Sequence, residues 1–281
     1  MRATVWGCRG SLATPGEETL RYGGNTSCVE LRLADGTVVV LDAGTGARAL
    51  GLRLAAEPPA VIHLLLTHLH LDHLEGLGFF RPLWTAGVEL HVWGPASSIL
   101  SLHERVARYL SPPLFPMHLS DVPAHVTFHD APEEPWTIGS ARFTAESVLH
   151  PGATIGYRVE ENGSTLTYIP DHEPAFGEEL ARRTPDWISG YSLARDATVV
   201  LHDAQYTERE YEDKAGWGHS SVADAVAFTR IAGARRLVLF HHDPMHGDDE
   251  LERLRERAEE LWGNGSAPPE LAFEGMEIGL D

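Results

Sequence analysis

The chain has 281 residues, of which 43% are apolar, and its 41 acidic and 22 basic side chains give a net charge of −19 with histidine counted as neutral. This acidity argues against a long nucleic-acid partner, because such partners are bound through many lysine and arginine contacts to phosphate. No run of 18 apolar residues and no secretory signal is found, so we expect neither a membrane span nor a membrane partner. The only cysteines, Cys8 and Cys28, exclude a disulfide framework, and we expect a cytoplasmic protein.

Short β-branched runs alternate with turn residues and helical patterns along the chain. The first half predicts strands at residues 3–6, 28–33, 37–41, 61–67 and 87–93, with helices at 47–56 and 97–109. Residues 111–135 are rich in proline and weakly periodic, and we expect an ordered surface excursion there. The second half predicts strands at 142–149, 154–159, 165–169, 196–202 and 236–240, with helices at 221–231 and 248–262. Two groups of strands with interposed helices predict a layered α/β sandwich, in one domain over residues 1–281.

The strongest local signal is the segment His68-Leu69-His70-Leu71-Asp72-His73, which follows the predicted strand 61–67 and precedes a predicted helix. A strand that stops abruptly presents His68 and His70 on one side of the loop. Asp72 and His73 then turn toward a second position. Imidazoles and carboxylates at this spacing suit Zn²⁺, and also Mn²⁺ or Fe²⁺.

With this motif the sequence resembles the metallo-β-lactamase superfamily over nearly its whole length. The resemblance implies a four-layer αββα sandwich that holds two divalent transition-metal ions. It implies further ligands at strand ends, namely His150 after residues 144–149, Asp171 after Tyr168-Ile169-Pro170, and His241 after residues 237–240. The implied ligands are His68, His70 and His150 for one ion and Asp72, His73 and His241 for the other, with Asp171 between them.

One ligand position has a neighbouring alternative. His242 directly follows His241, and successive residues at a strand end point to opposite sides, so only one of the two should face the metals. The family places its ligand directly after the apolar run, which favours His241.

The fold does not decide the reaction, because the superfamily hosts several. His70 stands where the oxygen-reducing members carry a glutamate, which argues against redox chemistry. The glycine-rich segments Gly7-Cys8-Arg9-Gly10-Ser11 and Gly23-Gly24-Asn25-Thr26-Ser27 resemble the start of ribonuclease Z-like phosphodiesterases and of phosphoribosyl cyclic-phosphate diesterases. Arg9, Arg21 and Tyr22 are candidates to contact a phosphate or a base, and Ser11 and Asn25 are candidates to line the pocket.

A second motif, Gly218-His219-Ser220-Ser221, resembles the histidine-bearing motif of ribonuclease Z-like enzymes, and Asp203 ends a buried strand upstream of it. A pair of Asp203 and His219 would raise the proton affinity of the imidazole and fix its tautomer, as a general acid requires. The alternative is that Ser220 simply caps a helix and that His219 is an incidental neighbour. Asp203 and His219 are therefore assigned to catalysis, together with Asp72.

The resemblance implies a hydrolase in which a hydroxide held between two metal ions attacks a phosphodiester while His219 protonates the leaving group. Residues 173–197 are too short to hold the arm with which ribonuclease Z grasps tRNA, so a small cyclic nucleotide or cyclic sugar phosphate is favoured as substrate. Two alternatives stay open. One is a lactone or thioester hydrolase of the same fold, and the other is a non-catalytic carrier similar to the pyrroloquinoline quinone biosynthesis protein. Formation of a homodimer also stays open.

Overall fold

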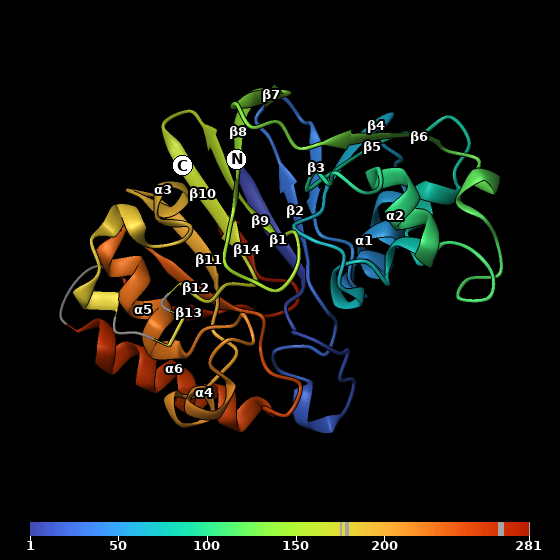
Figure 1. The fold of residues 1–281 in the computed structure, drawn as a ribbon. Coiled ribbons are helices and arrows are strands. Elements are labelled where there is room, and N and C mark those ends of the chain that lie inside the picture. Colours follow the sequence, from blue (N-terminus) through green and yellow to red (C-terminus); the bar gives the residue numbers. More distant parts are fainter. Residues whose placement is uncertain (175, 178–179, 264–266, 281) are drawn as a thin grey trace.

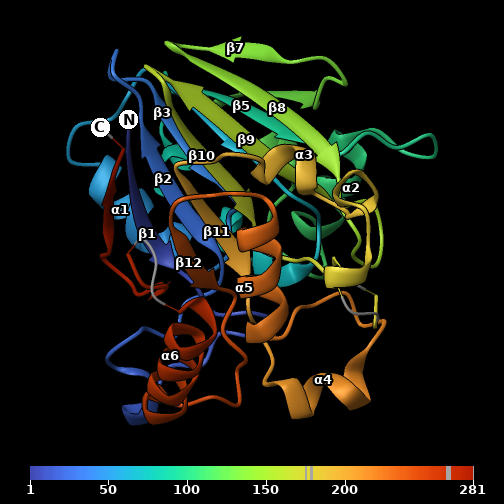
Figure 2. The ribbon, with the colours of Figure 1, turned by 90° about the vertical axis from the view of Figure 1, so that its left-hand side faces the viewer.

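The computed structural model describes residues 1–174, 176–177, 180–263 and 267–280, and its strands form two seven-stranded sheets that pack face to face (Figures 1 and 2). The first sheet has the spatial order β14 (Glu277–Gly279), β1 (Arg2–Gly7), β2 (Cys28–Arg32), β3 (Val38–Leu41), β4 (Val61–Leu65), β5 (Glu89–Gly94) and β6 (His125–Asp130). The second has the order β13 (Glu270–Leu271), β12 (Leu237–Phe240), β11 (Val199–Asp203), β10 (Ser164–Ile169), β9 (Ile155–Glu161), β8 (Ala141–Ser147) and β7 (Trp136–Ile138).

Helices cover the outer face of each sheet (Figures 1 and 2). On the side of the first sheet lie α1 (Gly46–Leu54) and α2 (Leu102–Tyr109), and on the side of the second lie α3 (Tyr191–Ala194), α5 (Val222–Ile231) and α6 (Asp248–Trp262). The short helix α4 (Glu208–Lys214) lies below the sandwich in both views and buries none of its residues. This arrangement confirms the predicted four-layer αββα sandwich. None of the described helices combines the length and the apolar character that crossing a membrane requires.

The core consists of apolar layers on both faces of each sheet. Leu41, Phe143, Tyr157 and Phe240 are fully buried in the layer between the two sheets. All six residues of β10 are buried, because an inner strand of a sheet covered on both faces meets no solvent. The outer layers are filled by side chains from α1 and α2 on one side and from α5 and α6 on the other.

Strand direction determines where the loops meet. β3, β4, β5 and β6 run parallel to one another, and β10, β11 and β12 do so in the second sheet. Their carboxyl ends therefore share one edge in each sheet. The histidine-rich segment after β4 and the residues after β10 and β12 come together at this edge.

The predicted surface excursion at 111–135 is partly wrong, because it contains strand β6, which pairs in parallel with β5. β6 lies at the edge of its sheet and is half-buried or exposed along its length, so it lacks the apolar alternation that reveals a strand. The short strands β7, β13 and β14 and the short helices α3 and α4 were not predicted either. Each contains few residues and hence little periodicity.

The helix predicted after the histidine motif is also wrong. The chain instead forms three short 3-10 helices at Leu71–His73, Leu77–Phe79 and Arg81–Trp84. Between the first two of these helices the backbone packs closely on Gly44, because a Cβ atom at Gly76 would lie 1.8 Å from the carbonyl oxygen of Gly44. The helix predicted from residue 97 begins only at Leu102, where Ser101 and Glu104 form a capping box.

Candidate metal centre

Seven side chains from the two sheets converge at the edge where the parallel strands end. They form two groups, in each of which the potential ligand atoms lie within 4.8 Å of one another. The loop after β4 contributes to both groups, and the second sheet contributes the rest from the ends of β8, β10 and β12. The first group is His68, His70 and His150, and the second is Asp72, His73, Asp171 and His241.

In the first group, ring nitrogens face one another across a small gap. His150 Nε2 lies 3.2 Å from His70 Nδ1, and the ring of His68 meets both of the other rings edge-on. His68 is 2% exposed, and within the described part of the chain its Nε2 atom has no hydrogen-bond partner. A buried imidazole nitrogen without a partner is costly unless it binds a cation.

The second group is centred on two carboxylates. His73 Nε2 lies 3.0 Å from Asp171 Oδ2 and 3.3 Å from Asp72 Oδ2. His241 Nε2 lies 3.2 Å from Asp72 Oδ2 and 3.3 Å from Asp171 Oδ1. Asp171 Oδ1 is also 3.8 Å from His68 Nε2 and 3.7 Å from His150 Nε2. Asp171 therefore reaches both groups, as a bridging ligand must.

Most of these rings are anchored through the nitrogen that faces away from the centre. The Nδ1 atoms of His73, His150 and His241 lie 2.8 Å from Asp42 Oδ2, 2.7 Å from the carbonyl oxygen of Gly218 and 2.9 Å from Gln205 Oε1 respectively. Because the anchored nitrogen carries the proton, the lone pair of each Nε2 points into the centre. Such anchoring fixes the tautomer and the orientation of metal-binding histidines.

Asp42 and Gln205 are functional residues that the sequence analysis missed. Asp42 is fully buried and accepts hydrogen bonds from the Thr67 backbone, from the Thr67 hydroxyl and from Tyr168 Oη, besides contacting His73. Its position at the end of a strand and before a glycine-rich turn was the available signal. Its backbone φ of 58° is uncommon for a residue other than glycine, and such conformations gather at functional sites.

Ionised carboxylates dominate the electrostatics of the centre. Burial lowers the pKa of His73, but Asp171, Asp72 and Asp42 outweigh it and hold this pKa well above its usual value, so a bound cation would displace a proton there. Burial opposes the charge on Asp171, but His241, His73 and His68 outweigh it and hold the pKa of this carboxyl well below its usual range. Burial, together with His73, holds the pKa of His68 well below its usual value. A neutral imidazole and an ionised carboxylate are the forms that bind metal ions. The residues present therefore suit two divalent cations.

His219 and Asp203 form a pair that adjoins both groups, and a ligand atom of His219 lies within 4.8 Å of those of His150 and Asp171 and of those of Asp203 and His241. His219 Nδ1 lies 2.7 Å from Asp203 Oδ2, and the other oxygen of Asp203 accepts the backbone N–H groups of Gln205 and Ser220. The His219 ring stacks on His241 with 5.0 Å between centroids. Burial lowers the pKa of His219, but the charge and hydrogen bond of Asp203 outweigh burial and leave this pKa above its usual value.

A serine caps the helix after this pair, as in the alternative interpretation, but His219 keeps its contact with Asp203. Ser221 caps α5 by accepting the backbone N–H of Asp224, so the capping residue is Ser221 rather than Ser220. Ser220 instead donates its hydroxyl to the carbonyl oxygen of His172. The capping serine and the paired histidine are thus separate features of the same segment.

The backbone conformation determines which of His241 and His242 faces the metal-ligand groups. His241 has a φ of 61°, which turns its ring toward Asp72 and Asp171. His242 Nε2 instead lies 2.9 Å from the carbonyl oxygen of Ala272, away from the two groups. Gly10 packs against the His241 ring, where a Cβ atom would lie 2.3 Å from Nδ1, so this position requires glycine.

The structure contradicts the predicted phosphate contact at Arg9. This side chain is fully buried, and its guanidinium donates to the backbone carbonyl oxygens of Gly23, Asp243 and His246. Arg9 therefore holds three chain segments together. A sequence cannot show which loops wrap around an arginine.

The other predicted substrate contacts lie in different places. Arg21 pairs with Asp249 and Glu252, and Tyr22 Oη donates to Glu252 Oε1, so both contact α6 rather than the metal-ligand groups. Asn25 donates to Glu274. Ser11 alone adjoins the centre, where its backbone N–H donates to Asp72 Oδ2 over 2.7 Å.

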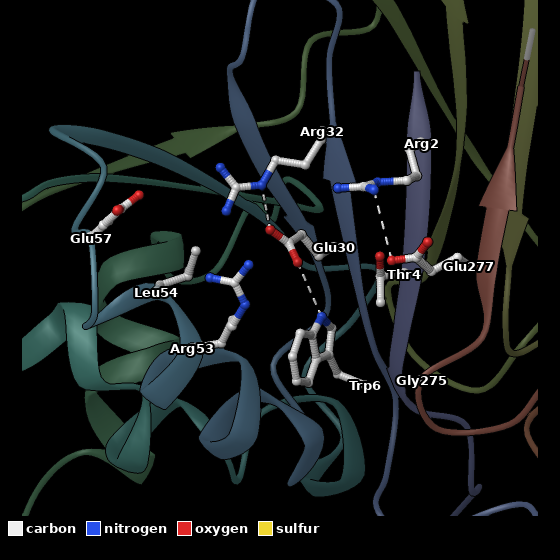
Figure 3. Close-up of a pocket in the computed structure, with 10 residues that line it drawn as sticks. All are labelled: Arg2, Thr4, Trp6, Glu30, Arg32, Arg53, Leu54, Glu57, Gly275 and Glu277. Atoms are coloured by element: carbon white, nitrogen blue, oxygen red, sulfur yellow. Dashed lines mark hydrogen bonds and ion pairs between the residues drawn. The ribbon is translucent and has the colours of Figure 1, made fainter.

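A separate polar hollow of about 550 Å³ lies between α1 and strands β1, β2 and β14 (Figure 3). Its charged groups largely pair with one another: Arg32 and Trp6 both donate to Glu30, and Arg2 lies 3.8 Å from Glu277. No residue of the metal-ligand groups lines it. The hollow is therefore separate from the metal-ligand groups.

Comparison with known proteins agrees with this geometry. The family profile described as "Beta-lactamase superfamily domain" matches residues 37–242. The ribonuclease Z of Myxococcus xanthus is 24% identical over 88% of this chain and 90% of its own. The metallo-β-lactamase fold protein YhfI of Bacillus subtilis superposes with a TM-score of 0.70 at 20% identity, over 99% of both chains. A structure titled as a new diphosphatase of the PhnP family gives a TM-score of 0.70 at 19% identity, over 100% of this chain and 98% of the other.

The family match spans more than half of the chain, and the fold and the convergent ligand groups agree with it. The chain belongs to the β-lactamase superfamily, as a metal-dependent hydrolase of the metallo-β-lactamase fold.

Proposed function

We propose that this hydrolase is a phosphodiesterase that cleaves a small phosphodiester, such as a cyclic nucleotide or a cyclic sugar phosphate. The observation that carries the proposal is the pair of His219 and Asp203 beside the two ligand groups. Hydrolysis of a thioester releases a thiolate, which is a far less basic leaving group than an alkoxide. Cleavage of an alkyl phosphodiester releases a strongly basic alkoxide and therefore gains most from a positioned acid.

The residues of the site would have two roles, namely to hold the metal ions that neutralise charge and to donate a proton. Metal ions held by the two groups would neutralise charge on the phosphate oxygens and supply a water-derived nucleophile at neutral pH. Asp203 accepts the Nδ1–H of His219, so the proton available to a substrate is on Nε2. The raised pKa of His219 favours the protonated form, and Asp203 would hold the ring while the proton passes to the leaving oxygen.

The ligand types favour Zn²⁺ as the bound metal, with Mn²⁺ or Fe²⁺ as alternatives, because five imidazoles and two carboxylates suit borderline ions better than Mg²⁺ or Ca²⁺. The net charge of −19 supports a small substrate over a long nucleic acid. We also propose a cytoplasmic location, since both cysteines are free and buried.

A substrate screen of the metal-loaded enzyme tests the proposal. Bis(p-nitrophenyl) phosphate, a cyclic nucleotide, a γ-lactone and a thioester would be compared at equal enzyme concentration. The proposal requires that kcat/KM for at least one phosphodiester exceeds that for the lactone and the thioester. Turnover of the lactone or thioester alone would establish the alternative hydrolase, and a protein without turnover of any of them would favour the carrier.

A further inference from the structure

A small pocket of about 200 Å³ adjoins the metal-ligand groups on the side of His219. It is lined by Leu149, His150, Pro151, Glu173, Phe176, Gly216 and Gly218. Two of these residues belong to the machinery described above: His150 is a member of the first ligand group, and Gly218 directly precedes His219. The pocket is therefore an extension of the reaction site. It is smaller than the roughly 300–1,000 Å³ of a complete ligand site, so it has room for only one part of a substrate.

The walls of this pocket offer apolar contact and no free charge. Leu149, Pro151 and Phe176 contribute apolar side chains, and Leu149 and Phe176 are 43% and 61% exposed. The one carboxylate, Glu173, is 1% exposed. Its oxygens accept hydrogen bonds from Tyr211 Oη and from the backbone N–H groups of Gly216 and Gly218, over 2.7–2.8 Å.

Glu173 also fixes the shape of the pocket. Its carboxylate accepts the N–H groups of Gly216 and Gly218 and so fixes the position of this loop. The carbonyl oxygen of Gly218 in the same loop anchors His150 Nδ1. Gly218 has a φ of 89°, and a Cβ atom there would lie 2.2 Å from Pro151 Cδ. The loop thus approaches Pro151 closely, and the pocket exists in the folded protein before any substrate arrives.

The position of the pocket indicates which part of the substrate would enter it. His219 protonates the departing oxygen in the proposed reaction, and the pocket lies next to His219 along the chain and next to His150 in space. The group attached to the departing oxygen is therefore the part of the substrate that reaches the pocket. A second phosphate would find no lysine or arginine among the lining residues, whereas a flat apolar ring would bury against Leu149, Pro151 and Phe176.

We infer that this pocket binds the ring of a nucleobase, which makes the substrate a nucleoside phosphodiester rather than a cyclic sugar phosphate. The inference rests on the proposed function and selects one of its two substrate classes. It assigns Leu149 and Phe176 as specificity-determining residues, since they supply the exposed apolar surface that a ring would cover.

Phenylphosphonate and methylphosphonate test the pocket directly, because they share the phosphonate group and differ only in the ring. Titration calorimetry of the zinc-loaded enzyme measures the dissociation constant of each. The ring should tighten binding about tenfold, the usual effect of burying one aromatic group. Leu149→Ser and Phe176→Ser should each reduce this phenyl-to-methyl ratio toward one, with methylphosphonate binding and metal content unchanged. Leu52→Ser is the matched control, because Leu52 is a 56% exposed leucine on α1 and should leave the ratio unchanged.

The outcomes separate this inference from the proposed function. A ratio near one in the wild-type enzyme, or a ratio that both pocket variants preserve, would overturn the pocket assignment even if phosphodiesters are cleaved. A zinc-loaded enzyme that cleaves no phosphodiester would overturn the proposed function instead, since the calorimetric ratio needs no turnover. Phe176→Ser alters an exposed side chain and keeps the test available if Leu149→Ser does not fold.

Discussion

Histidines gather in two places in this fold, at the edge where the two sheets meet and on the face of β4, β5 and β6 that looks toward the second sheet. In the second place His63, His91 and His129 form a stacked column with Trp93. Their nitrogens are engaged with neighbours: His91 Nδ1 lies 2.9 Å from His129 Nε2, His91 Nε2 lies 2.9 Å from Glu89, and Trp93 donates to His63. We call this group the histidine column.

The difference between the two places is the direction of the lone pairs. In the metal centre, backbone and side-chain acceptors hold the outer nitrogens, so the inner ones converge on two buried aspartates. In the histidine column the rings bond to one another, and none of its members belongs to a potential ligand group among the described residues. A cluster of histidines is therefore not sufficient for a metal site. Convergence of unpaired nitrogens around a buried carboxylate is the distinguishing feature.

The largest effect is expected for Asp171→Ala, because Asp171 contacts both ligand groups. The variant should lose at least one of two bound ions and all measurable hydrolase activity. Elemental analysis after expression in zinc-supplemented medium checks the metal content. Retention of two ions per chain would show that Asp171 is not the bridge.

The neighbouring histidines provide an internal comparison. His241→Ala should lower the metal content by about one ion, while His242→Ala should leave it nearly intact, since His242 bonds to Ala272. The same elemental analysis applies to both variants. Metal loss in His242→Ala alone would mean that the ligand is the second histidine of the pair.

His219→Ala removes the proposed acid and should keep both ions. Phosphodiester cleavage should slow by roughly 10²–10⁴-fold, the usual contribution of a general acid. The defect should shrink for p-nitrophenyl esters, whose leaving group departs without a proton. Equal slowing on good and poor leaving groups would indicate a phosphate-binding role, and metal loss would make His219 a ligand.

Asp42→Asn tests the anchoring of rings rather than the ligands themselves. The amide keeps the size of the carboxylate but weakens its hold on the His73 Nδ1–H. Metal affinity should fall by about 10–100-fold, as is usual when such an anchor is lost. Competition with a chromogenic chelator measures this affinity, and an unchanged value would remove Asp42 from the centre.

The histidine column should affect stability and leave metal binding unchanged. Burial, with His91 and His129, lowers the pKa of His63 from 6.5 to about 4. The unfolded chain therefore binds this proton first, so the free energy of unfolding should fall as the pH drops from 6.5 toward 4. His63→Gln should flatten this part of the curve in urea titrations while keeping two ions. A steeper curve in the variant would contradict the assignment of the proton to His63.

The sequence predicted His68, His70, Asp72 and His73 from their spacing after an apolar strand. The resemblance to the metallo-β-lactamase superfamily implied the other three candidate ligands, His150, Asp171 and His241, at the ends of later apolar runs. The sequence analysis missed Asp42 and Gln205 because their importance depends on which ring nitrogen they meet in space. It misplaced Arg9 for a related reason. An arginine beside glycines resembles a phosphate contact, but here the segment from Asp243 to His246 closes over it. Edge strands such as β6 escaped detection because half-exposed residues carry little periodicity.

The ligand groups draw on both halves of the sandwich. The segment His68 to His73 extends from the first sheet, whereas His150, Asp171 and His241 extend from the second. An ion held there would therefore connect the two sheets across their interface. By mass action, a free ion at 100 times its dissociation constant would add about 2.7 kcal/mol to the stability of the folded state. The melting temperature of this protein should therefore rise with the concentration of free metal. When metal is removed, the two sheets should separate first at the edge that carries the ligand groups.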